Sequence, residues 1–167
     1  MNIGLIAHDA KKKLMQNFCV AYRGILCKHE LYATGTTGRL IEEVTNLSIH
    51  KYLAGHLGGQ QQMGAQIENN EIDLVIYLRD PLSPKAHEPD ANNVISLCDV
   101  HNIPFATNLA SAELMIKALD RGDLDWRELY KRYAKIHLIL QKLFHFDEFC
   151  SIMNSGSIKV DVLSRKI

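Results

Sequence analysis

The feature that most restricts the fold of this sequence is an alternation of short apolar runs with longer segments of helical period. The apolar runs, which we expect to be strands, are 3–7, 31–34, 73–78 and 103–107. A segment of helical period follows each run, over 10–28, about 37–46, about 90–101 and about 110–119. A weaker run, 49–55, precedes a helix that begins near Gly58. This βαβα alternation predicts parallel strands joined by helices.

The predicted strands are apolar throughout, as in "IGLIA" (3–7), and do not alternate apolar with polar residues. Continuous apolar strands are typical of parallel sheets that helices cover on both faces. The fold class we predict is therefore α/β, with a mostly parallel central sheet between two helical layers. At 167 residues and 47% hydrophobic composition, one domain with a sizeable core is expected.

Charge and cysteine content exclude several classes of protein. The 19 lysines and arginines balance the 19 aspartates and glutamates, so we expect no nucleic-acid partner and no anionic membrane partner. The sequence begins without an apolar stretch of signal-peptide or transmembrane length, so we expect a cytoplasmic protein. The four cysteines form no C-x-x-C pair, which favours reduced and mostly buried thiols.

Polar, chemically active residues follow the predicted strands. His8 and Asp9 come directly after the first strand, with Lys12 one helical turn later, and Gly55 and His56 end the weak run. Ligands of such sheets collect at the carboxyl ends of the strands, where the loops emerge. We therefore expect these loops to meet in one crevice.

The segment "ATGTTG" (33–38) places threonines and glycines between a strand and the start of a helix. Backbone amides, hydroxyls and the helix dipole can together hold a phosphate there, and Lys12 can add a cation. The alternative for this segment is a tight turn with a threonine N-cap. The alternative for Lys12 is a solvated residue within the run 11–13.

One histidine and several carboxylates follow the strand 73–78. Asp80 directly follows this buried strand, where a carboxylate is costly unless it has a partner, and His87 and Asp90 lie in the proline-rich loop that continues from it. The alternative is an ordinary solvated acidic loop. The sequence has no H-x-x-x-H or H-E-x-x-H spacing, so we expect neither a metal nor another cofactor.

Several segments in order resemble the methylglyoxal synthase family. These segments include "LIAHDAKK" (5–12), "LYATGTTGRLI" (31–41), "AGHLGGQQQMGAQI" (54–67), "IDLVIYLRDPL" (72–82), "HEPD" (87–90) and "IPFATNLASAELMI" (103–116). The resemblance covers about residues 1–132. It implies a Rossmann-like domain, a homohexamer, and elimination of phosphate from dihydroxyacetone phosphate to give methylglyoxal in a glycolytic bypass.

The resemblance also implies roles for individual residues. His8, Lys12, Ala54 and Gly55 correspond to positions that contact the substrate, and Ala54 replaces a frequent serine. The phosphate loop corresponds to Thr34, Gly35, Thr36 and Thr37. The histidine that polarises the substrate oxygens corresponds to His87, and two acidic active-site positions correspond to Asp80 and Asp90. Dihydroxyacetone phosphate and inorganic phosphate are the ligands implied.

Gln60 departs from the family pattern. The family has "GGDQQ" where this chain has "GGQQQ" (58–62), and the aspartate of that motif is the family's proton-abstracting base. A neutral amide is too weak a base for this step. His56 is a second departure, because the family typically has proline there.

Three interpretations follow from this substitution. The first is a homologue with weakened activity that uses Asp9, Asp80 or Asp90 as a substitute base. The second is an inactive phosphate-ligand binder or regulator, for which the allosteric domain of carbamoyl phosphate synthetase, of similar fold, is a precedent. The third is an enzyme acting on another phosphorylated triose with His56 as base.

The C-terminal part of the chain has no counterpart in the resemblance. We expect a domain over 1–132 and a divergent extension over 133–167. Apolar residues at helical spacing predict an amphipathic helix over 134–150 that packs on the domain or on a neighbouring subunit. The segment 155–160 is expected to be a turn that leads into a short, disordered end.

Overall fold

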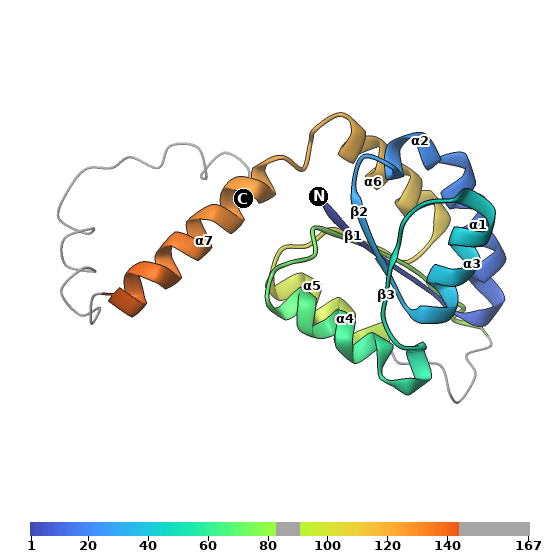
Figure 1. The fold of residues 1–167 in the computed structure, drawn as a ribbon, viewed down its shortest axis with the longest axis horizontal. Helices are drawn as coiled ribbons and strands as arrows, with labels where there is room; N and C mark the ends of the chain where they lie inside the picture. The colour runs from blue at the N-terminus through green and yellow to red at the C-terminus, as the bar shows by residue number, and fades with distance from the viewer. Residues whose placement is uncertain (83–90, 144–167) are drawn as a thin grey trace. The chain divides into compact units, whose positions relative to one another are not determined.

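In a computed structural model of the protein, residues 1–82 and 91–143 are described. The chain divides into two compact units, Met1–Arg127 and Glu128–Ile167. The first unit holds the whole sheet and the helices that cover it (Figure 1).

The sheet has five strands, and all of their pairings are parallel. The strands are β1 (Asn2–Ala7), β2 (Glu30–Ala33), β3 (His50–Lys51), β4 (Leu74–Leu78) and β5 (Phe105–Ala106). Their order is β3-β2-β1-β4-β5, so β1 lies at the centre. Every residue of β4 is buried, as a strand covered on both faces requires. The predicted α/β fold with a parallel central sheet is confirmed.

Helices cover both faces of the sheet (Figure 1). The helices of the described residues are η1 (Asp9–Lys11), α1 (Lys12–Ala21), α2 (Arg23–Leu26), α3 (Gly35–Thr45), η2 (Gly55–Leu57), α4 (Gly59–Glu68), α5 (Ala91–Val100), α6 (Leu109–Asp120) and α7 (Trp126–Leu143). Helix α7 continues from the first unit into the second. Helices α1, α3 and α6 lie on one face, and α4 and α5 lie on the other (Figure 1). The result is a three-layer domain.

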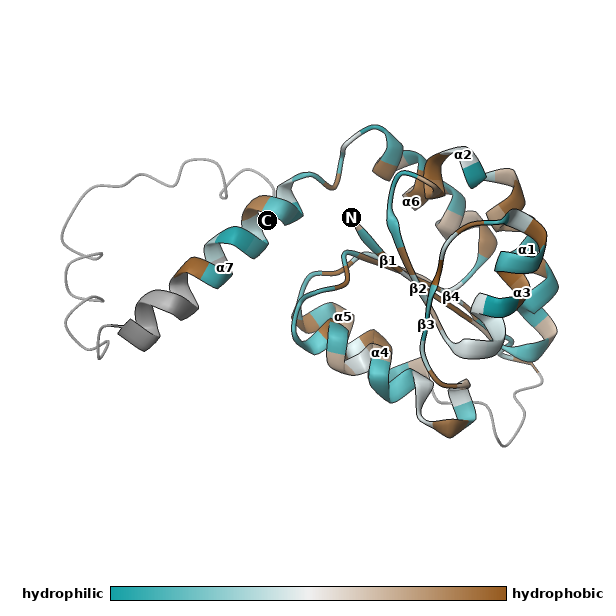
Figure 2. Ribbon diagram, viewed as in Figure 1, coloured by the Kyte–Doolittle hydropathy of each residue, from teal (hydrophilic) through white to brown (hydrophobic). Residues whose placement is uncertain are grey.

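The two faces of the sheet form two separate cores. Leu5 of β1 packs in the core that contains residues of α1, α3 and α6, whereas its neighbour Ile6 packs in the core with Met63 of α4 and Val94 of α5. Successive side chains of a strand point to opposite faces, so one apolar strand supplies both cores. Figure 2 shows apolar colour along the inner strands and mixed colour on the helices around them.

The predicted strand 49–55 is wrong in length, because β3 contains two residues. The backbone of Leu53 makes turn contacts in place of a ladder: its carbonyl oxygen accepts from the Gly35 amide at 3.0 Å, and its amide donates to the Gln62 side chain at 2.8 Å. The predicted helix 10–28 is also divided, into η1, α1 and α2, with non-helical backbone at Tyr22. These turns shape the loops that surround the site.

The predicted helix 134–150 begins earlier than expected. Helix α7 starts at Trp126 and is described to Leu143, so it continues through residues 132 and 133, between which we expected the domain to end. The two compact units instead meet between Arg127 and Glu128. The remainder of the predicted helix and the predicted turn at 155–160 lie outside the described residues. None of the helices described over 1–82 and 91–143 is long and apolar enough to cross a membrane.

A buried arginine, Arg127, binds several groups at the end of the first unit. The Arg127 guanidinium is fully buried and lies 3.4 Å from the carboxylate of Asp73, which is 4% exposed. It also donates to the carbonyl oxygens of His101 and Asn102, at 3.2 and 2.8 Å, and to the side chain of Asn70 at 2.7 Å. One side chain therefore connects the segment before β4 with the end of α5.

Candidate active site

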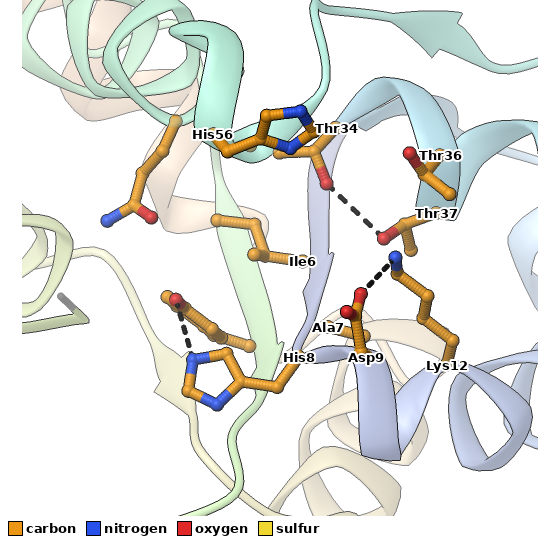
Figure 3. A pocket seen from close by; sticks show the side chains of 12 residues that line it. Ile6, Ala7, His8, Asp9, Lys12, Thr34, Thr36, Thr37 and His56 are labelled. Carbon is orange, nitrogen blue, oxygen red and sulfur yellow. Dashed lines mark hydrogen bonds and ion pairs between the residues drawn. The ribbon is translucent and has the colours of Figure 1, made fainter. Parts of the chain in front are cut away.

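A cavity of about 300 Å³ lies at the carboxyl ends of β1 and β2 (Figure 3). Its lining comes from the loops after these strands, from η2 and α4, and from β4. The lining residues are Ile6, Ala7, His8, Asp9, Lys12, Thr34, Thr36, Thr37, Gly55, His56, Gln60 and Tyr77. The loops after β1 and β2 and the segment around η2 meet here, as the sequence predicts.

Three threonines at the start of α3 form one wall of the cavity. Thr34 is the N-cap residue, yet its side chain makes no capping hydrogen bond, and its hydroxyl donates to the Thr37 hydroxyl at 3.3 Å. The Gly35 and Gly38 amides donate to the carbonyl oxygens of Leu53 and Thr34. The amides of Thr36 and Thr37 lie in the first turn of α3, where the helix itself supplies no carbonyl oxygen as acceptor. These donors favour an anion site over a purely structural cap.

Lys12 supplies a cation beside this wall. Its Nζ lies 2.5 Å from Oδ1 of Asp9, and its side chain is 21% exposed. In Figure 3 the amine of Lys12 points toward the side of the cavity that carries Thr36 and Thr37. Lys12 therefore lines the predicted phosphate site, which a freely solvated lysine would not do.

His8 is held in one orientation by two hydrogen bonds. Its Nδ1 accepts from the Asp80 amide at 3.0 Å, so the proton of the neutral ring is on Nε2, which lies 3.2 Å from the Tyr77 hydroxyl. The two rings make an edge contact at 5.4 Å between centroids. The Nε2–H therefore donates to the phenol oxygen and orients Tyr77, whose O–H is a suitable donor to a substrate oxygen.

Tyr77 was not predicted as a site residue. It belongs to the run 73–78, which reads as a continuous buried strand, and its side chain is fully buried. Tyr77 carries a polar group among the apolar residues that follow Asp73 in this run, and this was the available signal, because a buried tyrosine hydroxyl needs a polar partner.

The two glycines before Gln60 are explained by backbone geometry. Gly58 has φ of 99°, a left-handed conformation that side chains disfavour. A Cβ on Gly59 would overlap the carbonyl oxygen of Leu53. The close approach places Gln60 in the first turn of α4, where it is 5% exposed and lines the cavity.

We expect Gly59→Ala to lower the free energy of unfolding by roughly 1–3 kcal/mol or more, because the new methyl group forces the Leu53 segment away. Gly24→Ala is the matched control, since nothing lies within 4 Å of a Cβ at Gly24. Urea denaturation of both variants checks this expectation. Equal stabilities would show that the approach of Leu53 to α4 is not required.

The other predicted site residues have different positions. Gly35 and Ala54 do not line the cavity, although the Ala54 carbonyl oxygen accepts from the Gly59 amide at 3.1 Å. Asp80 lines a neighbouring hollow of about 520 Å³ and reaches the site through its backbone amide, which holds His8. His87 and Asp90 lie outside the described residues, so their roles stay predictions.

None of the three cysteines in the described part of the chain lines this cavity. Cys19, Cys27 and Cys98 are free thiols and do not line it, and Cys150 lies outside the described residues. Burial raises the pKa of Cys19 and the pKa of Cys98 to about 12, so both are protonated at neutral pH.

The sequence and the parallel α/β fold of this chain recur among known proteins. A family model described as MGS-like domain matches residues 15–107. Methylglyoxal synthase from Caldicellulosiruptor saccharolyticus is 66% identical over 129 residues, which cover 77% of this chain and 92% of that protein. Methylglyoxal synthase from Alkaliphilus metalliredigens is 61% identical over 131 residues, covering 78% and 98%.

A solved structure agrees with these sequences. The crystal structure of methylglyoxal synthase from Elizabethkingia anophelis NUHP1 matches with a TM-score of 0.67 at 41% identity, over 69% of this chain and 76% of that chain. The chain belongs to the methylglyoxal synthase family.

Proposed function

We propose that the protein binds dihydroxyacetone phosphate and eliminates phosphate to give methylglyoxal, at a rate that Gln60 lowers. One observation carries this proposal. The threonines of α3, which can donate hydrogen bonds to a phosphate, line the same cavity as Lys12 and Gln60. We extend the proposal to inorganic phosphate as a second ligand, to the cytoplasm as location and to the absence of a cofactor.

The reaction has two requirements that this cavity meets. Removal of a proton from the hydroxymethyl carbon gives an enediolate, whose oxygens need donors. The proposed donor is the Tyr77 hydroxyl, which His8 orients through its hydrogen bond to that hydroxyl. Cleavage of the carbon–oxygen bond then releases phosphate with the bonding electrons, and the enol that remains becomes methylglyoxal. We propose that the amides of Thr36 and Thr37 and the amine of Lys12 hold the departing anion, and the presence of all three residues in one lining supports this.

The third requirement is a base, and here the cavity departs from the family pattern. Gln60 cannot accept the proton. Asp9 is the one residue with a carboxylate among the described lining residues. Its Oδ1 lies 2.5 Å from Nζ of Lys12, which compensates its charge. We propose Asp9 as the substitute base ahead of Asp80, which lines the neighbouring hollow.

A second candidate function is a binder or regulator that responds to a phosphorylated ligand without turning it over. The buried amide of Gln60 favours this candidate, because it preserves the shape of the cavity while removing the base. His56 also lines the cavity, with an exposed side chain, and remains the candidate base for a different phosphorylated triose.

We expect phosphate to bind in this cavity and Lys12→Ala to weaken that binding about tenfold or more, because a charge-assisted hydrogen bond contributes roughly 1.5–3 kcal/mol. Thr36→Ala should weaken it less, through loss of one hydroxyl. Lys13→Ala is the matched control, because Lys13 is exposed and does not line the cavity. Calorimetry with inorganic phosphate gives the affinities, and unchanged affinity in both site variants would defeat the assignment.

We also propose a homohexamer, on the strength of the family membership. Light scattering at micromolar concentration should give the mass of six chains. A stable monomer at that concentration would refute the oligomer and leave the fold unchanged.

A further inference from the structure

Helix α7 carries an exposed apolar stripe. Leu129, Tyr133 and Ile136 are 53%, 67% and 52% exposed, and their spacing of four and three places them on one face of the helix. The sequence continues the same spacing to Leu140 and Leu143. A continuous apolar stripe is unfavourable in water, so we expect a partner to cover this one.

Basic side chains border the stripe. Arg132 is exposed, and it is adjacent on the helix surface to Leu129, three residues earlier, and to Ile136, four residues later. Lys135 is exposed as well. Over 128–143 the sequence has four lysines and arginines against one glutamate. Figure 2 shows polar and apolar colour side by side along the described part of α7, which is therefore a basic amphipathic helix.

The zero net charge of the chain, from which we expected no anionic membrane partner, divides unevenly between the two units. Residues 128–167 contain seven of the 19 lysines and arginines and four of the 19 aspartates and glutamates, so their formal net charge is +3. Residues 1–127 contain the other twelve and fifteen, so their formal net charge is −3. The partner of α7 must therefore cover an apolar stripe and also compensate positive charge. A membrane that contains anionic lipids does both.

Copies of this chain fit α7 less well than such a membrane. A second α7 would bring the same positive charge beside the first, which like-charge repulsion disfavours. In the described part of the first unit, the exposed large apolar residues lie on separate elements, such as Val100 on α5 and Leu114 on α6. Apolar residues that are scattered singly over a surface do not provide a continuous groove for a helix.

We propose that α7 is a peripheral membrane-binding helix that lies in the plane of an anionic lipid surface. Leu129, Tyr133 and Ile136 enter the boundary between headgroups and acyl chains, and Arg132 and Lys135 bind lipid phosphates. A tyrosine ring with its polar hydroxyl is favoured at this depth. The helix lies on the bilayer without crossing it, since none of the described helices is long and apolar enough to cross. This inference does not depend on the ligand of the cavity.

Co-sedimentation of the full chain with lipid vesicles tests the proposal. The partition coefficient should be about tenfold or more higher for vesicles of phosphatidylglycerol and phosphatidylcholine than for phosphatidylcholine alone, because each basic residue near an anionic surface adds attraction. Raising the salt from about 0.1 M to about 1 M shortens the Debye length from about 10 Å to about 3 Å, and it should lower binding to the anionic vesicles. Equal partition to the two kinds of vesicle, or binding to neither, would overturn the proposal.

Ile136→Glu and Lys135→Glu should each lower the partition coefficient for anionic vesicles about tenfold or more. The first places a charge in the apolar stripe, and the second reverses a charge beside it. Leu114→Glu and Lys117→Glu are the matched controls, because they make the same kinds of change at exposed residues of α6 and should alter the partition coefficient little.

Light scattering without vesicles separates membrane binding from contact between copies. All four variants should give the same particle mass as the unmodified protein. A change of mass confined to the two α7 variants would overturn the proposal, since it would show that a second copy covers the stripe. Equal losses of vesicle binding in the α7 and α6 variants would also overturn it, because the effect would then depend on net charge and not on α7.

Discussion

Gln60→Asp is expected to raise the rate of methylglyoxal formation from dihydroxyacetone phosphate by about 10²-fold or more. A positioned general base contributes typically about 10²–10⁴-fold, which corresponds to roughly 3–5 kcal/mol of transition-state stabilisation. The other parts of the site, namely the α3 threonines, Lys12 and the His8–Tyr77 pair, line the same cavity as residue 60. A carboxylate at this position would restore the missing base.

Gln60→Asn is the control for this experiment, since asparagine has the shape of aspartate without the charge. It should give no gain, whereas Gln60→Asp should give a large one. If both variants are inactive while phosphate affinity is retained, the binding or regulatory function is favoured. High activity already present with Gln60 and unchanged in Gln60→Ala would show that another group is the base, and Asp9→Asn would then be the variant to measure.

Arg127→Ala is expected to lower the free energy of unfolding by about 3–5 kcal/mol, the range for breaking a buried ion pair from one side. The substitution leaves the buried Asp73 carboxylate without this cation at 3.4 Å, and it removes donors from the carbonyl oxygens of His101 and Asn102. Chemical denaturation at a fixed protein concentration measures the loss.

Arg121→Ala is the matched control for this change. Arg121 pairs with Asp123 at 2.7 Å, but both side chains are at least half exposed, so its loss should cost less than about 1 kcal/mol. The double variant Arg127→Leu with Asp73→Asn should be more stable than Arg127→Ala, because no unpaired charge remains buried. Similar losses for Arg121→Ala and Arg127→Ala would contradict the anchoring role of Arg127.

The fold was predictable because its pattern is local. Continuous apolar runs such as 3–7 and 74–78 are typical of strands whose two faces are both covered by helices, and the helical segments between them predict parallel connections. The length of β3 was not predictable, since it depends on contacts of Leu53 with Gly35 and Gln62 that are distant or turn-specific.

The site was predictable to the extent that it follows strand ends. His8, Lys12 and the α3 threonines come directly after β1 and β2, and the structure brings them together. Tyr77 was missed because its burial within β4 resembles core packing. The sequence shows that Asp80 follows β4 but not that Asp80 lines the neighbouring hollow, and its role in the chemistry stays a prediction.

The buried role of Arg127 was also hidden in the sequence. It occurs in the charged stretch "LDRGDLDWREL" (119–129), where most charges are solvent-exposed. A buried arginine is recognised by the acceptors that surround it, and here these come from segments 25 to 57 residues earlier in the chain. Because the groups that bind Arg127 are distant in the sequence, no pattern of neighbouring residues indicates that it is buried.

The central claim is that this cavity binds the phosphorylated triose while Gln60 limits its turnover. Calorimetric titration of the unmodified protein with dihydroxyacetone phosphate measures both quantities together, since binding gives heat that saturates and turnover gives heat that continues. The account predicts saturation near one ligand per chain and continuing heat about 10²-fold below that of Gln60→Asp. The absence of saturable binding, or continuing heat equal in the two proteins, would contradict it.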